Sequence, residues 1–220
     1  MHGAEQMRQE TARLGLACAG GIALIALTAC GSSGDDLNFQ RGQVLMDVLA
    51  DANLREASDL SGVLGAGGPA PGGVPATASY AGAALASFTG TEEFSATARF
   101  DMDVDFNDGS LSGRMSNWSP ETGNFYTMEG QVLISNGVIL PDGTFDAQMA
   151  GNVRREMTAQ RRLQLQEEGI EPPEDIQLVF SGVAEGSFHD NWRTGERATH
   201  VDGAFSAPGF VEGGFAGRRD

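Results

Sequence analysis

The segment Phe94–Phe106 alternates apolar and polar residues without a break. Every even position in it holds an apolar residue, and every odd position holds a polar one. Successive side chains of a strand point to opposite faces of a sheet, so this pattern predicts a long strand with one buried and one wet face. A chain that contains such a segment has to build a sheet around an apolar core.

The residues that follow predict a hairpin. Asp108-Gly109 is a preferred sequence for a two-residue type I′ turn, because both central residues need positive φ. Such a turn fixes the register of the two strands. On the buried face it pairs Phe106 with Leu111, Val104 with Gly113, and Met102 with Met115. On the wet face it places Asp103 opposite Arg114, as an exposed cross-strand ion pair.

Further segments of the same kind recur between glycine-marked turns. We expect strands over 79–88, 94–106, the second arm of the hairpin, 125–135, 144–151, 176–189, 197–207 and 210–218. Asn136-Gly137 is expected to be the turn that ends the fourth of them. Eight antiparallel strands close well into a barrel whose interior is filled by side chains. The sequence therefore predicts an all-β fold, an eight-stranded antiparallel β-barrel over residues 79–219.

One segment interrupts this rhythm. Residues 152–169 are rich in Arg, Gln, Glu and Leu, and they predict a helix within an insertion over 152–175, with Pro172-Pro173 beyond its end. The helix would carry four arginines: Arg154, Arg155, Arg161 and Arg162. Two interpretations stay open, a solvated insertion between strands or a partner-facing device on one rim of the barrel.

The amino-terminal part is predicted to fall into four pieces. Residues 1–29 have the form of a signal peptide, with Arg8 and Arg13 before an uncharged run too short to span a bilayer. Residues 30–36 form a polar tether, and 37–60 a helical segment in which Val44, Leu45, Val48, Leu49 and Ala52 recur at helical spacing. Residues 61–78 contain no charge and are rich in Gly, Pro and Ala, which predicts a flexible linker.

The four residues Leu27-Thr28-Ala29-Cys30 end the apolar run. They resemble the lipobox of bacterial lipoproteins. The resemblance implies that the peptide before Cys30 is removed and that Cys30 carries a diacylglyceryl group and an acylated amino terminus. It also implies anchoring in the bacterial outer membrane, on its periplasmic or its outward-facing side. The alternative is an ordinary secretory signal in which the cysteine is incidental.

Composition excludes several functions. The chain has no lysine, and after removal of residues 1–29 the 12 remaining arginines and 28 acidic residues leave a net charge of −16. Such a chain has no basic field with which to bind nucleic acid. It is also repelled by anionic lipids, so a lipid anchor would have to hold it at the membrane. No grouping with the spacing of a catalytic site is present, so we expect neither an enzyme nor a bound cofactor.

Two histidines form the one candidate metal site. A turn at Thr194-Gly195 would pair His189 with His200 across a hairpin, with Asp202 on the same face. Two imidazoles and a carboxylate suit a transition metal. Apolar residues that alternate with the histidines place them on the outer face instead, which favours two solvated side chains.

Several short motifs, in order, resemble a known family. They are Val74–Gly82, Phe100–Gly113, Gly143–Phe145 with Gly151, Gly182–Phe188, Val201–Phe205 and Gly213–Arg219. Together with the lipobox they resemble the transferrin-binding-protein-like surface lipoprotein barrels, in their small single-barrel, solute-binding branch. The resemblance implies a lipoprotein on a Gram-negative surface that captures iron proteins, haem carriers or other solutes.

The function expected from these features is a binding module for a protein or small solute, held on the membrane by lipid. Two alternatives stay open. One is a structural cell-envelope lipoprotein without a soluble ligand. The other is a lipocalin-like carrier of an apolar ligand, although the many bulky residues predicted to face inward would crowd eight strands.

Overall fold

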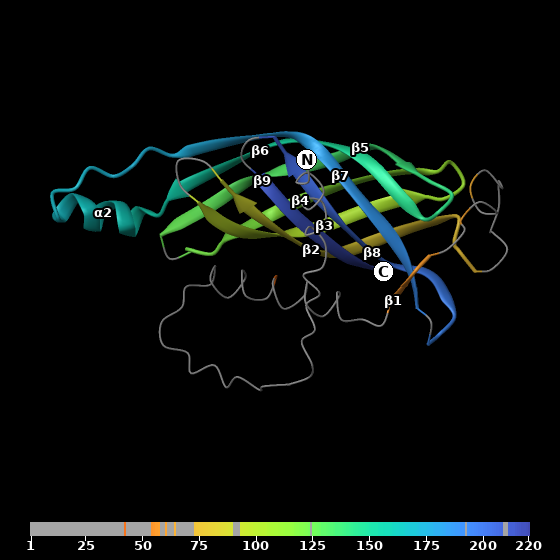
Figure 1. Cartoon of the computed structure of the whole chain (residues 1–220). Helices are drawn as coiled ribbons and strands as arrows, with labels where there is room; N and C mark the ends of the chain where they lie inside the picture. The colour runs from red at the N-terminus through yellow and green to blue at the C-terminus, as the bar shows by residue number, and fades with distance from the viewer. Residues whose placement is uncertain are drawn as a thin grey trace, which may run out of the picture. The chain divides into compact units, whose positions relative to one another are not determined.

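The structure is a computed structural model, and it describes residues 42, 54–57, 60, 64, 73–89, 93–123, 125–191, 193–208 and 211–220. Eight long strands make up most of this part (Figure 1). They are β2 (Thr77–Phe88), β3 (Phe94–Asp105), β4 (Ser110–Pro120), β5 (Tyr126–Ile139), β6 (Thr144–Met157), β7 (Ile176–Asn191), β8 (Glu196–Ala207) and β9 (Val211–Arg219). A short strand β1 (Leu54–Glu56) and a helix α2 (Ala159–Glu167) complete it.

The eight long strands close into an antiparallel barrel. Each strand pairs with the next along the chain, and β9 pairs with both β8 and β2, which closes the sheet. The predicted fold class is therefore confirmed. Closure removes the free edges that an open sheet of this length would present to other chains.

The register of the β3–β4 hairpin differs from the prediction by two residues. Val104 pairs with Leu111, and Met102 with Gly113. The loop has four residues rather than two, because the Asp105 carboxylate accepts hydrogen bonds from the Asn107 and Asp108 amides, at 2.9 and 3.1 Å, and folds the chain into a wider turn. A shift by two preserves the strand faces, so the apolar face stays inside.

The predicted ion pair on the wet face is wrong for the same reason. Arg114 lies opposite Asp101, with 3.4 Å between its Nε and the carboxylate. Asp103 instead accepts a hydrogen bond from the Ser79 hydroxyl at 2.6 Å.

The predicted turn at Asn136-Gly137 is also wrong. β5 continues through it to Ile139, and the register shifts between Ser135 and Val138. Asn136 takes a φ of 53°, the left-handed conformation that asparagine tolerates, and it forms a bulge rather than a hairpin. A Cβ on Gly137 would lie 2.3 Å from the Leu111 side chain, so the bulge also brings β5 close to β4.

The predicted helix over 152–169, in the insertion 152–175, begins too early. β6 runs to Met157, and the helix covers only Ala159–Glu167, with Thr158 as its N-cap. Val153, Arg155 and Met157 are buried, whereas Arg154 between them is exposed. This alternation is a period of two, which β5 and β7 on either side complete by pairing with the segment.

The folded unit begins before the predicted linker. β1 pairs antiparallel with the last residues of β7, which extend past the β6–β7 pairing. Leu54–Glu56 is therefore a strand, whereas the sequence predicted a helix over 37–60. Ala57 and Leu60 are fully buried in the core, and their amides donate to carbonyls of Phe188 and Pro141 at 2.8 and 2.7 Å. Gly42 is helical; most of 37–53 and of the predicted linker 61–78 lies outside the described residues.

The barrel interior is filled by large side chains that lie against glycines of the neighbouring strand. A Cβ on Gly203 would lie 2.5 Å from the Phe215 ring, and one on Gly213 would lie 2.4 Å from the Phe205 ring. Phe145 fills the corresponding space at Gly186. The recurring Gly and Phe of the sequence thus form a packing pattern in which a missing side chain makes room for a ring.

Candidate functional site

The rim that carries α2 is held by arginines. Arg154 at the end of β6 and Arg162 on α2 both reach the carboxylate of Asp175, at 3.0 and 2.9 Å, and Arg154 also pairs with Glu156 at 2.8 Å. Desolvation raises the pKa of Asp175, but the two arginines and the Met157 amide together outweigh it and hold this pKa below its usual value. Two of the four arginines predicted as candidate binding residues therefore fasten α2 to the barrel.

The other two arginines lie against aromatic rings. Arg155 points into the barrel and is almost fully buried, with its guanidinium 3.6 Å from the centre of the Tyr126 ring and 4.3 Å from that of Phe94. Arg161 lies 5.1 Å from the ring of Phe125. Such cation–π contacts stabilise a desolvated guanidinium. Arg155 thus packs at the edge of the core. The sequence analysis missed this because it placed Arg155 on a helix.

The histidine pair predicted from the turn is present. His189 and His200 are register partners on β7 and β8, and the His189 Nε2 atom lies 2.8 Å from a carboxylate oxygen of Asp202. The expectation that both histidines are solvated is wrong, because His200 is only 8% exposed. Its Nδ1 atom lies 2.9 Å from the Thr199 hydroxyl. In the part of the chain that the structure describes, no group of three His, Cys, Asp or Glu residues could hold a metal ion.

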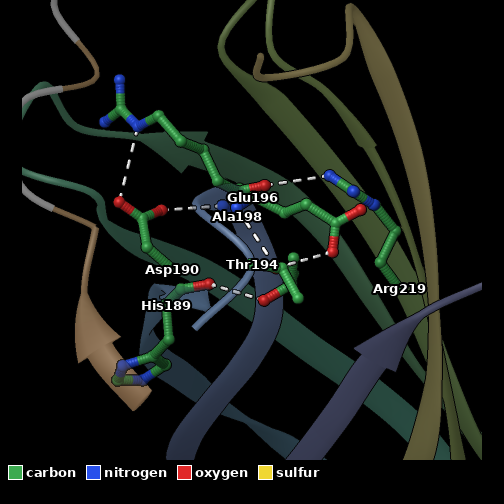
Figure 2. Close-up of polar contacts among 8 residues, drawn as sticks. His189, Asp190, Thr194, Glu196, Ala198 and Arg219 are labelled. Carbon is green, nitrogen blue, oxygen red and sulfur yellow. Dashed lines mark hydrogen bonds and ion pairs between the residues drawn. The ribbon is translucent and has the colours of Figure 1, made fainter. Parts of the chain in front are cut away.

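The turn between β7 and β8 is more irregular than a simple hairpin. Its register shifts after His189, and Ala198 takes a φ of 48° although it is fully buried. Figure 2 shows how this backbone is held: the Ala198 amide donates to Asp190 at 2.8 Å, and Arg219 donates to the Arg197 carbonyl at 2.9 Å. The carboxylate and the guanidinium thus fix an unfavourable conformation from two sides.

Tyr80 secures the same turn from inside the barrel. Its hydroxyl donates to the Ala198 carbonyl at 2.6 Å, and burial raises the pKa of Tyr80 well above its usual range. Burial lowers the pKa of His200, and the nearby Arg218 lowers it further. The Tyr80 hydroxyl and the His200 imidazole thus both make hydrogen bonds within the fold.

The outer surface carries exposed apolar residues that the sequence analysis missed. Eight large apolar residues are well exposed among the described residues, and all fall between positions 125 and 183: Phe125, Leu133, Val138, Leu140, Leu163, Ile170, Val179 and Val183. The signal was present in the polar faces of the strands, where aliphatic residues replace charged ones.

Pairing across β5, β6 and β7 places nine uncharged outward positions side by side. We call them the exposed wall: Gln131, Leu133, Ser135, Gln148, Ala150, Asn152, Val179, Ser181 and Val183. Leu133 lies in one row with Ala150, and Val183 in the next row with Gln148. Figure 1 shows the three strands running together along one side of the barrel. In a chain with a net charge of −16, a neutral area of this kind is unusual.

A groove of about 280 Å³ adjoins this wall over β7, β8 and β9. It is lined in part by Val183, Ala204 and Ser206, and by two carboxylates, Glu185 and Glu212. Glu185 is also the register partner of Asp146 on β6, so two exposed carboxylates lie opposite each other at the end of the wall. Like charges in a cross-strand pair repel each other.

A second groove, of about 460 Å³, lies over β2, β3 and β4. Its lining is mostly hydroxyls and carboxylates, and Ser79 and Asp103 in it are already hydrogen-bonded to each other. It therefore differs from the first groove in being lined mostly by polar side chains.

The chain is similar to solved structures of one kind of protein. No protein-family model matches the chain, and no curated protein matches it. It is similar to two crystal structures of transferrin binding protein B from Haemophilus parasuis Hp5, with 16% and 17% identity and TM-scores of 0.39 and 0.41. Each match covers 68% of this chain but only 26% or 27% of the other, so the chain spans about a quarter of their length.

Two expectations concern residues that the structure does not place. Cys30 and the signal peptide before it lie outside the described residues. Among those that are described, no helix is both long and apolar enough to cross a membrane.

Proposed function

We propose that this chain is a lipid-anchored binding module of the bacterial outer membrane, which holds a protein or small solute on the outside of its barrel. The observation that carries the proposal is the distribution of side chains. The interior is filled by residues such as Phe100, Phe145, Phe188 and Phe215, each at most 1% exposed. A filled interior argues against a carrier of an apolar ligand, whereas three large apolar residues, Leu133, Val179 and Val183, are exposed together with uncharged polar residues on the exposed wall.

The lipid anchor is supported by the residues around Cys30 alone. Anchoring is tested by producing the whole chain in a Gram-negative host fed with a fatty acid that carries an alkyne tag. We expect the label on the wild-type chain, which should fractionate with the outer membrane. A Cys30→Ala chain should be unlabelled and released. Equal labelling of both chains, or none of either, would refute the anchor.

Protease treatment of intact cells separates a binding module from a structural envelope protein. A module that meets ligands outside the cell is cut, whereas a protein that spaces the envelope from within is spared until the outer membrane is opened. Protection of the chain in intact cells would favour the structural alternative and restrict any ligand to the periplasm.

A further inference from the structure

The exposed wall offers aliphatic side chains, and the groove beside it offers carboxylates. The wall presents the aliphatic side chains of Leu133, Val179 and Val183, each about half exposed. Arg114 on β4 lies opposite Leu133, and Glu185 follows Val183 on the same face of β7. The groove continues from Val183 and is bordered by Glu185 and Glu212. An uncharged area that carries aliphatic side chains and ends in a carboxylate-lined groove suits a surface with aliphatic and basic side chains.

The carboxylates of this groove lack cationic partners within the described part of the chain. No ion pair there involves Glu185 or Glu212, whereas Asp101, Asp175 and Asp190 each hold an arginine. Glu185 also lies opposite Asp146, so two negative charges repel each other beside the groove. A cation placed in the groove would relieve this repulsion, and a second carboxylate would increase it.

We propose that the exposed wall and its groove dock a basic protein, whose aliphatic side chains cover Leu133, Val179 and Val183 while a lysine or arginine enters between Glu185 and Glu212. The proposal names the partner class of the binding function proposed above, and it rests on that function. The net charge of −16 favours the same partner, because it attracts cationic proteins over a distance and repels acidic ones. A second copy of this chain would bring the same carboxylates and the same net charge to the interface.

The test uses the whole chain with Cys30→Ala, which is purified without lipid. Two labelled synthetic peptides serve as probes, one alternating leucine with lysine and the other leucine with glutamate, and binding is measured by fluorescence anisotropy at physiological ionic strength. We expect the leucine–lysine peptide to bind and the leucine–glutamate peptide not to bind. Equal binding of both peptides would overturn the proposal.

Variants locate the binding. Glu185→Gln with Glu212→Gln should weaken binding of the leucine–lysine peptide by about tenfold, and Val179→Ser with Val183→Ser should weaken it by a similar factor. The matched control, Asp103→Asn with Asp108→Asn, removes the same charge from β3 and its loop and should change affinity less than about twofold. All of these positions are exposed or solvent-facing, and thermal unfolding checks that each variant is folded.

Two results would contradict the proposal. If the control weakens binding as much as the groove variant, the peptide responds to net charge rather than to this surface. If sedimentation shows a dimer that Val179→Ser with Val183→Ser dissociates, the wall is an interface between copies of the chain. Because the probe measurements use an unlipidated chain, they can fail independently of the anchoring test on Cys30.

Discussion

Outward side chains are buried on one side of the barrel and exposed on another. On β2, β3 and β9 the outward residues Ala83, Thr97 and Ala216 are at most 5% exposed, and helical Gly42 lies against Thr97 so closely that a Cβ there would be 2.7 Å from the Thr97 Cβ. On the exposed wall, Leu133 and Val179 are 47% and 58% exposed. We refer to the first side as the covered wall.

The difference shows that strand alternation decides direction but not exposure. The covered wall carries small residues, over which a neighbouring segment can approach closely. The exposed wall carries larger aliphatic residues without such a cover among the described residues. A group of outward aliphatic residues of that kind is typical of an interaction surface, which agrees with the binding function that we propose.

The largest expected difference is in the stability lost when a buried and an exposed leucine are each replaced by alanine. Leu60→Ala should reduce the free energy of unfolding by about 2–5 kcal/mol, because Leu60 is fully buried in the core. Leu133→Ala, on the exposed wall, should cost less than about 1 kcal/mol. Urea unfolding of both variants measures the difference. A small effect of Leu60→Ala would mean that the segment before β2 does not stabilise the barrel.

A charge introduced on each wall gives the next largest contrast. Thr97→Arg places a guanidinium where the side chain is 2% exposed, and it should destabilise the fold by at least about 2 kcal/mol. Val183→Arg, on the exposed wall, should change stability by less than about 0.5 kcal/mol. Thermal unfolding compares them, and equal shifts in Tm would remove the distinction between the walls.

A smaller effect, of opposite sign, is expected at the turn between β7 and β8. Ala198 has a φ of 48°, which is costly for a residue with a Cβ and acceptable for glycine. Ala198→Gly should therefore stabilise the fold by about 1 kcal/mol, provided that its contacts with Asp190 and Tyr80 persist. Gly195→Ala is the matched reverse change, at a φ of 72°, and should destabilise. If both variants lose stability, packing rather than backbone strain governs this turn.

The smallest effect concerns His200, which points outward and is nevertheless buried. Its pKa is lowered by burial and by Arg218, so the unfolded chain binds a proton more readily than the folded one. The stability that neutral His200 contributes is complete above the ordinary histidine pKa of about 6.5, and it is lost as pH falls through the lowered folded-state value. Unfolding measured across this range should show a weaker pH dependence in His200→Gln. An unchanged profile would assign the dependence to other groups.

Local pattern predicted more of the fold than of the surface. The alternation of Phe94–Phe106 identified a strand and its buried face, because side-chain direction follows from the backbone alone. The same reasoning applied to Thr194-Gly195 paired His189 with His200 correctly. It failed at Arg154 and Arg155, where arginine and glutamate suggested a helix although the positions alternate between rim and core.

Turn chemistry was ambiguous for a related reason. Asn136-Gly137 and Asp108-Gly109 both contain the residues that positive φ requires. Such residues suit a hairpin turn, a wider loop or a bulge, and the neighbouring strands decide among these. Aliphatic residues on the polar faces of single strands were visible in the sequence, but their assembly into one surface was not, because Leu133 and Val183 come together only through two sets of strand pairs.

By itself the sequence determined that this chain builds an antiparallel barrel with an apolar interior, since a strict period of two leaves one face that must avoid water. It also supplied the residues before Cys30 that predict a lipid anchor. Tertiary structure alone decided which outward residues are covered, where β1 and Leu60 complete the core, and that uncharged positions of β5, β6 and β7 form one wall. Exposure and adjacency are properties of chain segments that are distant in sequence, and only the closed sheet brings those segments together.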